Sequence, residues 1–141
     1  MTWGAALREQ ARADLERLVT AGIRAAEPVL EAGRWLPPMP LFVTFAGELR
    51  ALKLDQSALS DRRPASLVSA AIYLLAQHAP EARAVALVTG SRLAAERRDA
   101  IEVWAEHRDG AALTVLRPGP GRGSRPTSAY RGSRLVWATE R

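Results

Sequence analysis

His107 is the residue whose type and neighbours come closest to a catalytic arrangement. It follows Glu106 and stands two residues before Asp109, so a carboxylate could orient its ring as a general base. On an extended strand, however, Glu106 points to the opposite face, because successive side chains alternate. We therefore favour a surface histidine at the end of a turn and predict no catalytic residue. A small enzyme that uses His107 as its base is the third-ranked function.

The other histidine and the composition indicate no bound metal or cofactor. His78 falls near the end of a predicted helix, where a histidine interacts favourably with the terminal carbonyl groups. Two isolated histidines form no pair at metal-binding spacing. The chain has no cysteine, which excludes disulfides, thiol nucleophiles, iron–sulfur clusters and cysteine-ligated zinc. The run from Val88 to Arg92 resembles the start of a dinucleotide-binding turn, but the later glycines of that fingerprint are absent.

A group of arginines at the C-terminal end is the main candidate for binding an anion. The net charge is +5, and the whole excess falls in residues 117–141, which hold six arginines and one acid. Glycine backbone can approach a phosphate, and arginine can hold it bidentately. Together with Tyr130 and Trp137, this mixture is typical of single-stranded nucleic-acid sites. The alternative is a solvated loop. The candidate anion-binding residues are Arg117, Arg122, Arg125, Arg131 and Arg134.

The elements that must position these residues follow from the periodicity of the apolar side chains. Apolar residues recur at three- and four-residue steps from Gly4 to Ala32, with Pro28 expected to kink or interrupt that helix, and again after Pro64, so two main helices are predicted. Runs rich in aromatic and β-branched residues predict strands at 41–45, 48–54, 84–89 and 134–139, together with the two arms of a hairpin at 99–118.

These elements predict an α+β fold in a single domain, 1–141. We expect an antiparallel sheet of about five or six strands with the two main helices packed on one face. The domain begins with an N-terminal helical segment, 1–33. A loop rich in glycine, proline and arginine, 118–133, precedes the last strand.

The Asp109–Gly110 pair predicts the register of the hairpin and, through it, a partner surface. A two-residue type I′ turn at this pair places Arg108 opposite Ala111. One face of the hairpin is then apolar, and the other is apolar in its middle and charged at its edges. A mixed face of this kind can bind a partner, and tryptophan is enriched in binding hot spots. The candidate partner-binding residues are Trp104, Leu113, Val115 and Trp137.

Three segments resemble a group of uncharacterised bacterial proteins. These segments are Leu41–Arg50, Ala84–Val88 and Asp99–Gly110. Members of that group carry a similar first strand, an Ala-Val-Ala strand and a hairpin with the pattern Asp-Ala-Ile, then Glu-His, then Asp-Gly. The resemblance covers about residues 40–118. Members often continue with Pro-Tyr, where this chain has Pro118-Gly119. The resemblance implies no activity.

The expected function is binding rather than catalysis. We predict a non-enzymatic protein-interaction or accessory module, alone or as a homodimer, whose partner is itself or another protein. Weak binding of anions or nucleic acid through the arginine-rich segment is the alternative. The N-terminus lacks a signal-peptide pattern, and the longest nearly apolar run, 67–76, is shorter than the roughly 20 residues that a membrane helix needs. We therefore expect a cytoplasmic protein with no membrane partner.

Overall fold

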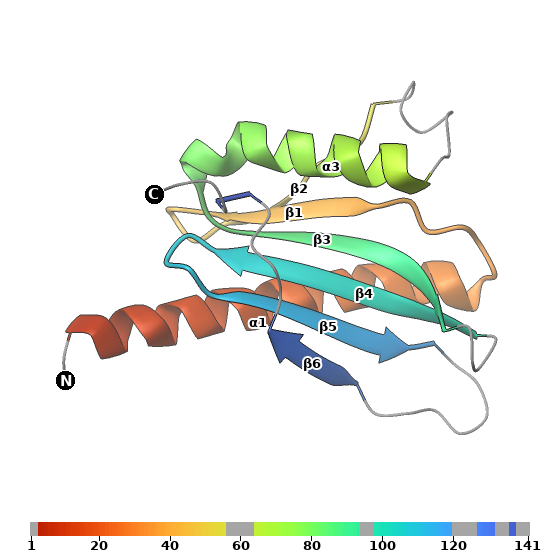
Figure 1. Ribbon diagram of the computed structural model, residues 1–141, viewed down its shortest axis with the longest axis horizontal. Coiled ribbons are helices and arrows are strands. Elements are labelled where there is room, and N and C mark those ends of the chain that lie inside the picture. Colours follow the sequence, from red (N-terminus) through yellow and green to blue (C-terminus); the bar gives the residue numbers. More distant parts are fainter. Residues whose placement is uncertain (1–2, 56–63, 94–97, 120–126, 132–135, 138–141) are drawn as a thin grey trace.

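A six-stranded antiparallel sheet lies between two helices in the described part of the chain (Figure 1). This computed structural model describes residues 3–55, 64–93, 98–119, 127–131 and 136–137. The strands follow the order β2-β1-β3-β4-β5-β6, and each pairs antiparallel with its neighbours. The elements, in chain order, are α1 (Trp3–Glu31), β1 (Met39–Thr44), β2 (Leu49–Ala51), α3 (Pro64–His78), the 3-10 helix η1 (Ala79–Glu81), β3 (Ala82–Leu93), β4 (Arg98–His107), β5 (Ala112–Pro118) and β6 (Ser128–Arg131). The predicted α+β class is confirmed.

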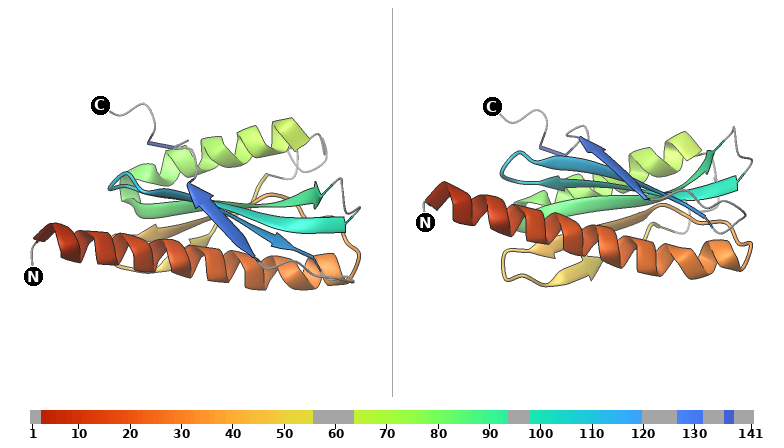
Figure 2. Two further views of the ribbon diagram at one scale, coloured as in Figure 1. Left: turned by 60° about the horizontal axis from the view of Figure 1, so that its bottom comes forward. Right: turned by 90° about the horizontal axis from the view of Figure 1, so that it is seen from below.

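The two helices cover opposite faces of the sheet (Figure 2), so the prediction that both pack on one face is wrong. The central strand β3 explains the difference. Its side chains at Ala86 and Val88 pack on the α1 side, whereas those at Val85 and Leu87 pack on the α3 side. A strand that is apolar on both faces must be covered on both faces. In the sequence, the near-continuous apolar run at 84–88 is the feature that indicates a strand buried on both faces.

Helix α1 runs to Glu31 without a break at Pro28, contrary to the interruption that the proline predicts. The helix ends in a Schellman motif. Gly33 has a φ of 70°, its N–H donates to the carbonyl of Leu30 at 2.9 Å, and the N–H of Arg34 donates to Val29 at 3.0 Å. These bonds satisfy the last carbonyl groups of the helix. Pro28 removes one helical hydrogen bond, the one that an N–H at this position would donate to the carbonyl of Arg24, and the helix continues for less than one turn beyond it.

The β4–β5 hairpin closes with three loop residues, not the two that the sequence predicts. His107 N–H donates to the carbonyl of Ala111 at 2.8 Å, and Gly110 N–H donates to His107 at 3.0 Å. Gly110 has a φ of 117°, which fits a turn followed by a glycine bulge. Val103 therefore pairs with Val115. The predicted register is wrong by one residue, and such a slip moves every β5 side chain to the other face of the sheet.

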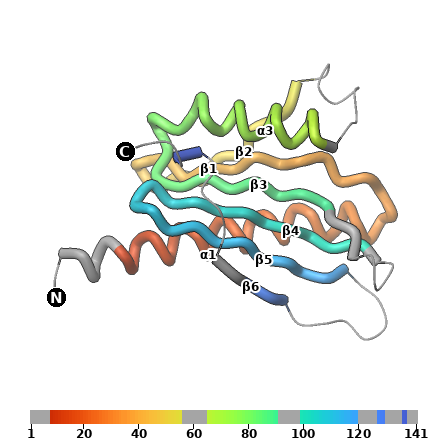
Figure 3. The backbone as a smooth tube through the Cα atoms, viewed as in Figure 1, coloured from red at the N-terminus to blue at the C-terminus, as the bar shows by residue number. Residues whose placement is uncertain are grey.

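The C-terminal part also differs from the prediction. Strand β6 occupies Ser128–Arg131, within the segment expected to be a loop. Only Val136 and Trp137 of the expected strand at 134–139 are described, and they form a bend. The turn between β1 and β2 and the turn between β4 and β5 lie at the same end of the sheet, near the C-terminal end of α3 (Figure 3). No helix among the described residues is long and apolar enough to cross a membrane.

Replacing Gly110 with valine tests the hairpin turn. The left-handed φ of 117° is unfavourable for a β-branched residue, so Gly110→Val should lower the free energy of unfolding by about 1–2 kcal/mol. Urea denaturation followed by circular dichroism measures this change. Ala51→Val, on the exposed edge strand, is the control and should stay within about 0.5 kcal/mol of the wild type. Equal stability of the two variants would show that Gly110 is not under backbone constraint.

Candidate functional site

A buried ionic network joins α1 to the sheet at the hairpin end. The guanidinium of Arg83 on β3 donates to both carboxylate oxygens of Asp14 on α1, through Nε at 2.7 Å and Nη2 at 2.8 Å. Nε2 of His107 lies 2.9 Å from Oδ2 of the same carboxylate. The side chains of Asp14 and His107 are each 6% exposed. The surface position predicted for His107 is therefore wrong.

Both ring nitrogens of His107 are engaged. Nδ1 lies 3.2 Å from the backbone nitrogen of Asp109 and 3.2 Å from Oδ1 of the same residue, while Nε2 faces the carboxylate of Asp14. A general base needs a free nitrogen within reach of a substrate proton. The geometry instead supports a structural role, in which the ring connects the hairpin turn to α1. As predicted, the neighbouring Glu106 packs on the opposite face of the sheet.

Sequence reasoning missed Asp14 and Arg83. Asp14 lies on the apolar stripe of α1, three residues after Ala11 and four before Leu18. An acid at such a position predicts a buried cationic partner, because an unpaired carboxylate is costly in a core. The partner could not be named, since Arg83 lies 69 residues away in the sequence.

Removing the carboxylate of Asp14 tests this network. Asp14→Ala should lower the free energy of unfolding by about 3 kcal/mol, because it removes the carboxylate that pairs with the part-buried guanidinium of Arg83 and the buried ring of His107. Thermal and urea denaturation measure the change. Glu16→Ala is the matched control on the same helix, because its contact with Arg12 is exposed and 3.7 Å long, and such pairs contribute less than about 1 kcal/mol. Similar losses in both variants would contradict a stabilising role for the network.

A second buried acid holds a C-terminal segment on the other face of the sheet. We call Val136 and Trp137 the C-terminal strap; it lies on the α3 side of the sheet, opposite α1 (Figures 1 and 2). Glu106 is fully buried. Its carboxylate accepts the N–H of Val136 at 3.2 Å and the N–H of Trp137 at 2.7 Å. These two N–H groups help to satisfy a carboxylate that is buried in an apolar core.

The indole ring of the strap fills a pocket of the α3-side core. Trp137 is 1% exposed and belongs to the same cluster as Trp104, which is 7% exposed. The guanidinium of Arg108 stacks 5.1 Å from the centre of the Trp137 ring. Arg108 also donates to the carbonyl groups of Ala79 and Ala82. These two backbone carbonyl groups therefore hold the Arg108 guanidinium in position against the indole ring.

Three of the four predicted partner-binding residues are buried in the structure. Trp104 and Trp137 lie inside the α3-side core, and Val115 is buried in the α1-side core. The mixed face expected to bind a partner is covered. Leu113 differs, because it is only partly buried and lines an open groove. The register shift of the hairpin placed it there, on the α1 side.

The predicted anion-binding residues are described only in part. Arg117 is 44% exposed at its side chain and lies 3.3 Å from the carboxylate of Glu27. Arg122, Arg125 and Arg134 lie outside the described residues, as does the side chain of Arg131. Arg117 is thus the only one of the five whose side chain is described, and the anion site stays a prediction.

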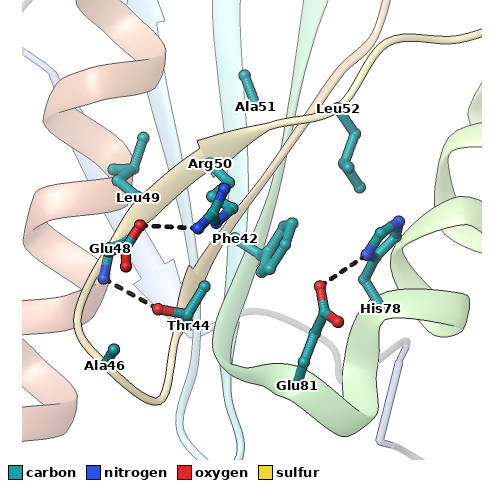
Figure 4. A pocket seen from close by; sticks show the side chains of 10 residues that line it. All are labelled: Phe42, Thr44, Ala46, Glu48, Leu49, Arg50, Ala51, Leu52, His78 and Glu81. Atoms are coloured by element: carbon teal, nitrogen blue, oxygen red, sulfur yellow. Dashed lines mark hydrogen bonds and ion pairs between the residues drawn. The ribbon is translucent and has the colours of Figure 1, made fainter.

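An open pocket of about 780 Å³ lies between the β1–β2 hairpin and the C-terminal end of α3 (Figure 4). The side chains of Glu48 and Arg50 form an ion pair at 2.7 Å, and Nδ1 of His78 lies 3.0 Å from Glu81. The His78 ring packs against Phe42, with 5.2 Å between the ring centres. The charged side chains that line this pocket are thus already paired. No group of three metal-ligating side chains occurs in the part of the chain that the structure describes.

An apolar groove of about 400 Å³ lies between α1 and the β4–β5 hairpin. Its apolar lining comes from both elements, and charged side chains of both signs stand around it. The lining residues are Arg8, Ala11, Arg12, Leu15 and Glu16 of α1, and Asp109, Ala111, Ala112 and Leu113 of the hairpin. This groove combines an apolar floor with a polar rim, the usual composition of a protein interface.

Comparisons with protein families, curated proteins and solved structures find no match for this chain. The resemblance of residues 40–118 to uncharacterised bacterial proteins stays a prediction. A functional assignment must therefore come from the geometry of the described residues.

Proposed function

We propose that this protein is a non-enzymatic interaction module that forms a homodimer through the groove between α1 and the β4–β5 hairpin. The observation that carries the proposal is the apolar lining of this groove, formed by Leu15, Leu113 and three alanines. Burial of the apolar surface in this groove is favourable, and an open groove between a helix and a hairpin suits a protein partner better than a small polar substrate.

The charges around the groove support a second copy as the occupant. Arg8 and Arg12 supply positive charge, and Glu16 and Asp109 supply negative charge. A two-fold axis brings the same patch of two subunits together, so a patch that carries both signs can complement itself. A partner of one strong charge would meet repulsion from half of this rim.

The engagement of the candidate catalytic groups also favours binding over catalysis. His107 uses both ring nitrogens within the protein, and His78 is paired with Glu81. We further propose a cytoplasmic location, which the absence of cysteine supports because cytosolic proteins rarely need disulfides.

Filling the groove tests this function. Ala111 is exposed and lines the groove, so Ala111→Arg should weaken dimerisation by about tenfold or more, because the added guanidinium must be desolvated without a partner. Sedimentation equilibrium measures the dissociation constant. Tyr73→Arg is the control: Tyr73 is 66% exposed on α3, on the opposite face, and this variant should dimerise like the wild type.

Two outcomes would overturn the proposal. The first is a wild-type protein that stays monomeric at the highest concentration examined. The second is an Ala111→Arg variant that dimerises as strongly as the wild type while remaining folded by circular dichroism.

A further inference from the structure

The C-terminal strap is held by contacts that resemble the recognition of a peptide. Its backbone meets the carboxylate of Glu106, and its indole ring enters a pocket beside Trp104 and beneath Arg108. We call this pocket and the Glu106 carboxylate the strap seat. The strap follows β6, the edge strand of the sheet, in the chain. The described contacts between strap and seat are non-covalent, so the same contacts can form with a separate peptide.

The seat recognises two features of its occupant. Glu106 accepts two consecutive main-chain N–H groups, which any non-proline pair of residues can supply. The pocket takes an aromatic ring whose face stacks on the cation of Arg108. A short peptide with an aromatic residue preceded by a non-proline residue therefore has the required chemistry.

One polar group of the strap is left without a hydrogen bond in the seat. The indole Nε1 of Trp137 is buried and has no hydrogen-bond partner in the part of the chain that the structure describes. A buried donor without an acceptor destabilises the state in which the strap is bound. In addition, departure of the strap would return water to the Glu106 carboxylate, which offsets part of the energy of the two lost hydrogen bonds. Both effects lower the cost of opening.

The cover of the α3-side face also depends on the strap. Helix α3 packs over β1 and β3, and the strap residue Trp137 belongs to the cluster that includes Trp104 of β4. The strap is thus an intramolecular occupant that contacts both the pocket and the buried carboxylate.

We propose that the strap seat is a peptide-binding site, and that an aromatic-bearing peptide of a partner protein binds there by replacing the C-terminal strap. This site lies on the face opposite the groove and does not depend on dimerisation. The strap acts as a competitor in cis, so the apparent affinity for a partner peptide falls by the fraction of molecules in which the seat is open.

A labelled peptide with the sequence of residues 132–141 tests the proposal by fluorescence anisotropy. The full chain carrying Trp137→Ala has lost its own occupant and should bind this peptide about ten- to a thousandfold more tightly than the wild type, because open states of this kind are about 0.1–10% populated. A peptide in which alanine replaces the tryptophan should not bind. Tyr73→Ala removes an exposed aromatic ring outside the seat and should bind like the wild type.

A second variant keeps the test valid if Trp137→Ala does not fold. Val136→Pro retains the indole ring but removes the N–H that donates to Glu106 at 3.2 Å, so it should loosen the strap and raise peptide affinity. A folded Trp137→Ala or Val136→Pro variant that binds the peptide no more tightly than the wild type would overturn the proposal. Binding that persists with the alanine peptide would overturn it as well. Dimerisation is measured separately by sedimentation, so failure of either proposal can be recognised without the other.

Discussion

Strand β3, at the centre of the sheet, is apolar on both faces, and the rest of the structure depends on covering both of them. Strand β3 directs Ala86 and Val88 to one side and Val85 and Leu87 to the other. Neither face can be left in water without losing hydrophobic stabilisation. Helix α1 covers one face, with Gly22 allowing it to approach Val88 closely. Helix α3 covers β1 and β3 on the other, and the C-terminal strap completes the cover beside β4.

Two adjacent residues of β4 anchor the covers of the two faces. His107 points toward α1 and meets Asp14, whereas Glu106 points to the other side and holds the strap. This division follows from the alternation of side chains along a strand. Each anchor includes a buried carboxylate that is satisfied by specific donors. Such groups add little net stability over an apolar core, but an incorrect arrangement would leave a charge unpaired, so they specify one packing of helix, sheet and strap.

The two proposed binding surfaces, the groove and the strap seat, differ in whether the protein itself already fills them. The groove beside Leu113 is open and apolar, so the proposed dimer would depend on the concentration of the protein. Trp137 fills the strap seat, so the proposed partner peptide would have to compete with a segment of the same chain. The two surfaces lie on opposite faces of the sheet and share no residue. Binding at one therefore need not exclude binding at the other.

The sequence by itself determined the α+β class and the two helices, because these depend on local periodicity, and it indicated a left-handed glycine at Gly110. Only the tertiary structure decided which face each helix covers and which residues form the buried networks. Asp14 and Arg83 are 69 residues apart, and Glu106 and Trp137 are 31 apart. No local pattern records contacts at that separation. The hairpin register also escaped prediction, since two- and three-residue turns share the Asp-Gly signal yet place Leu113 on opposite faces.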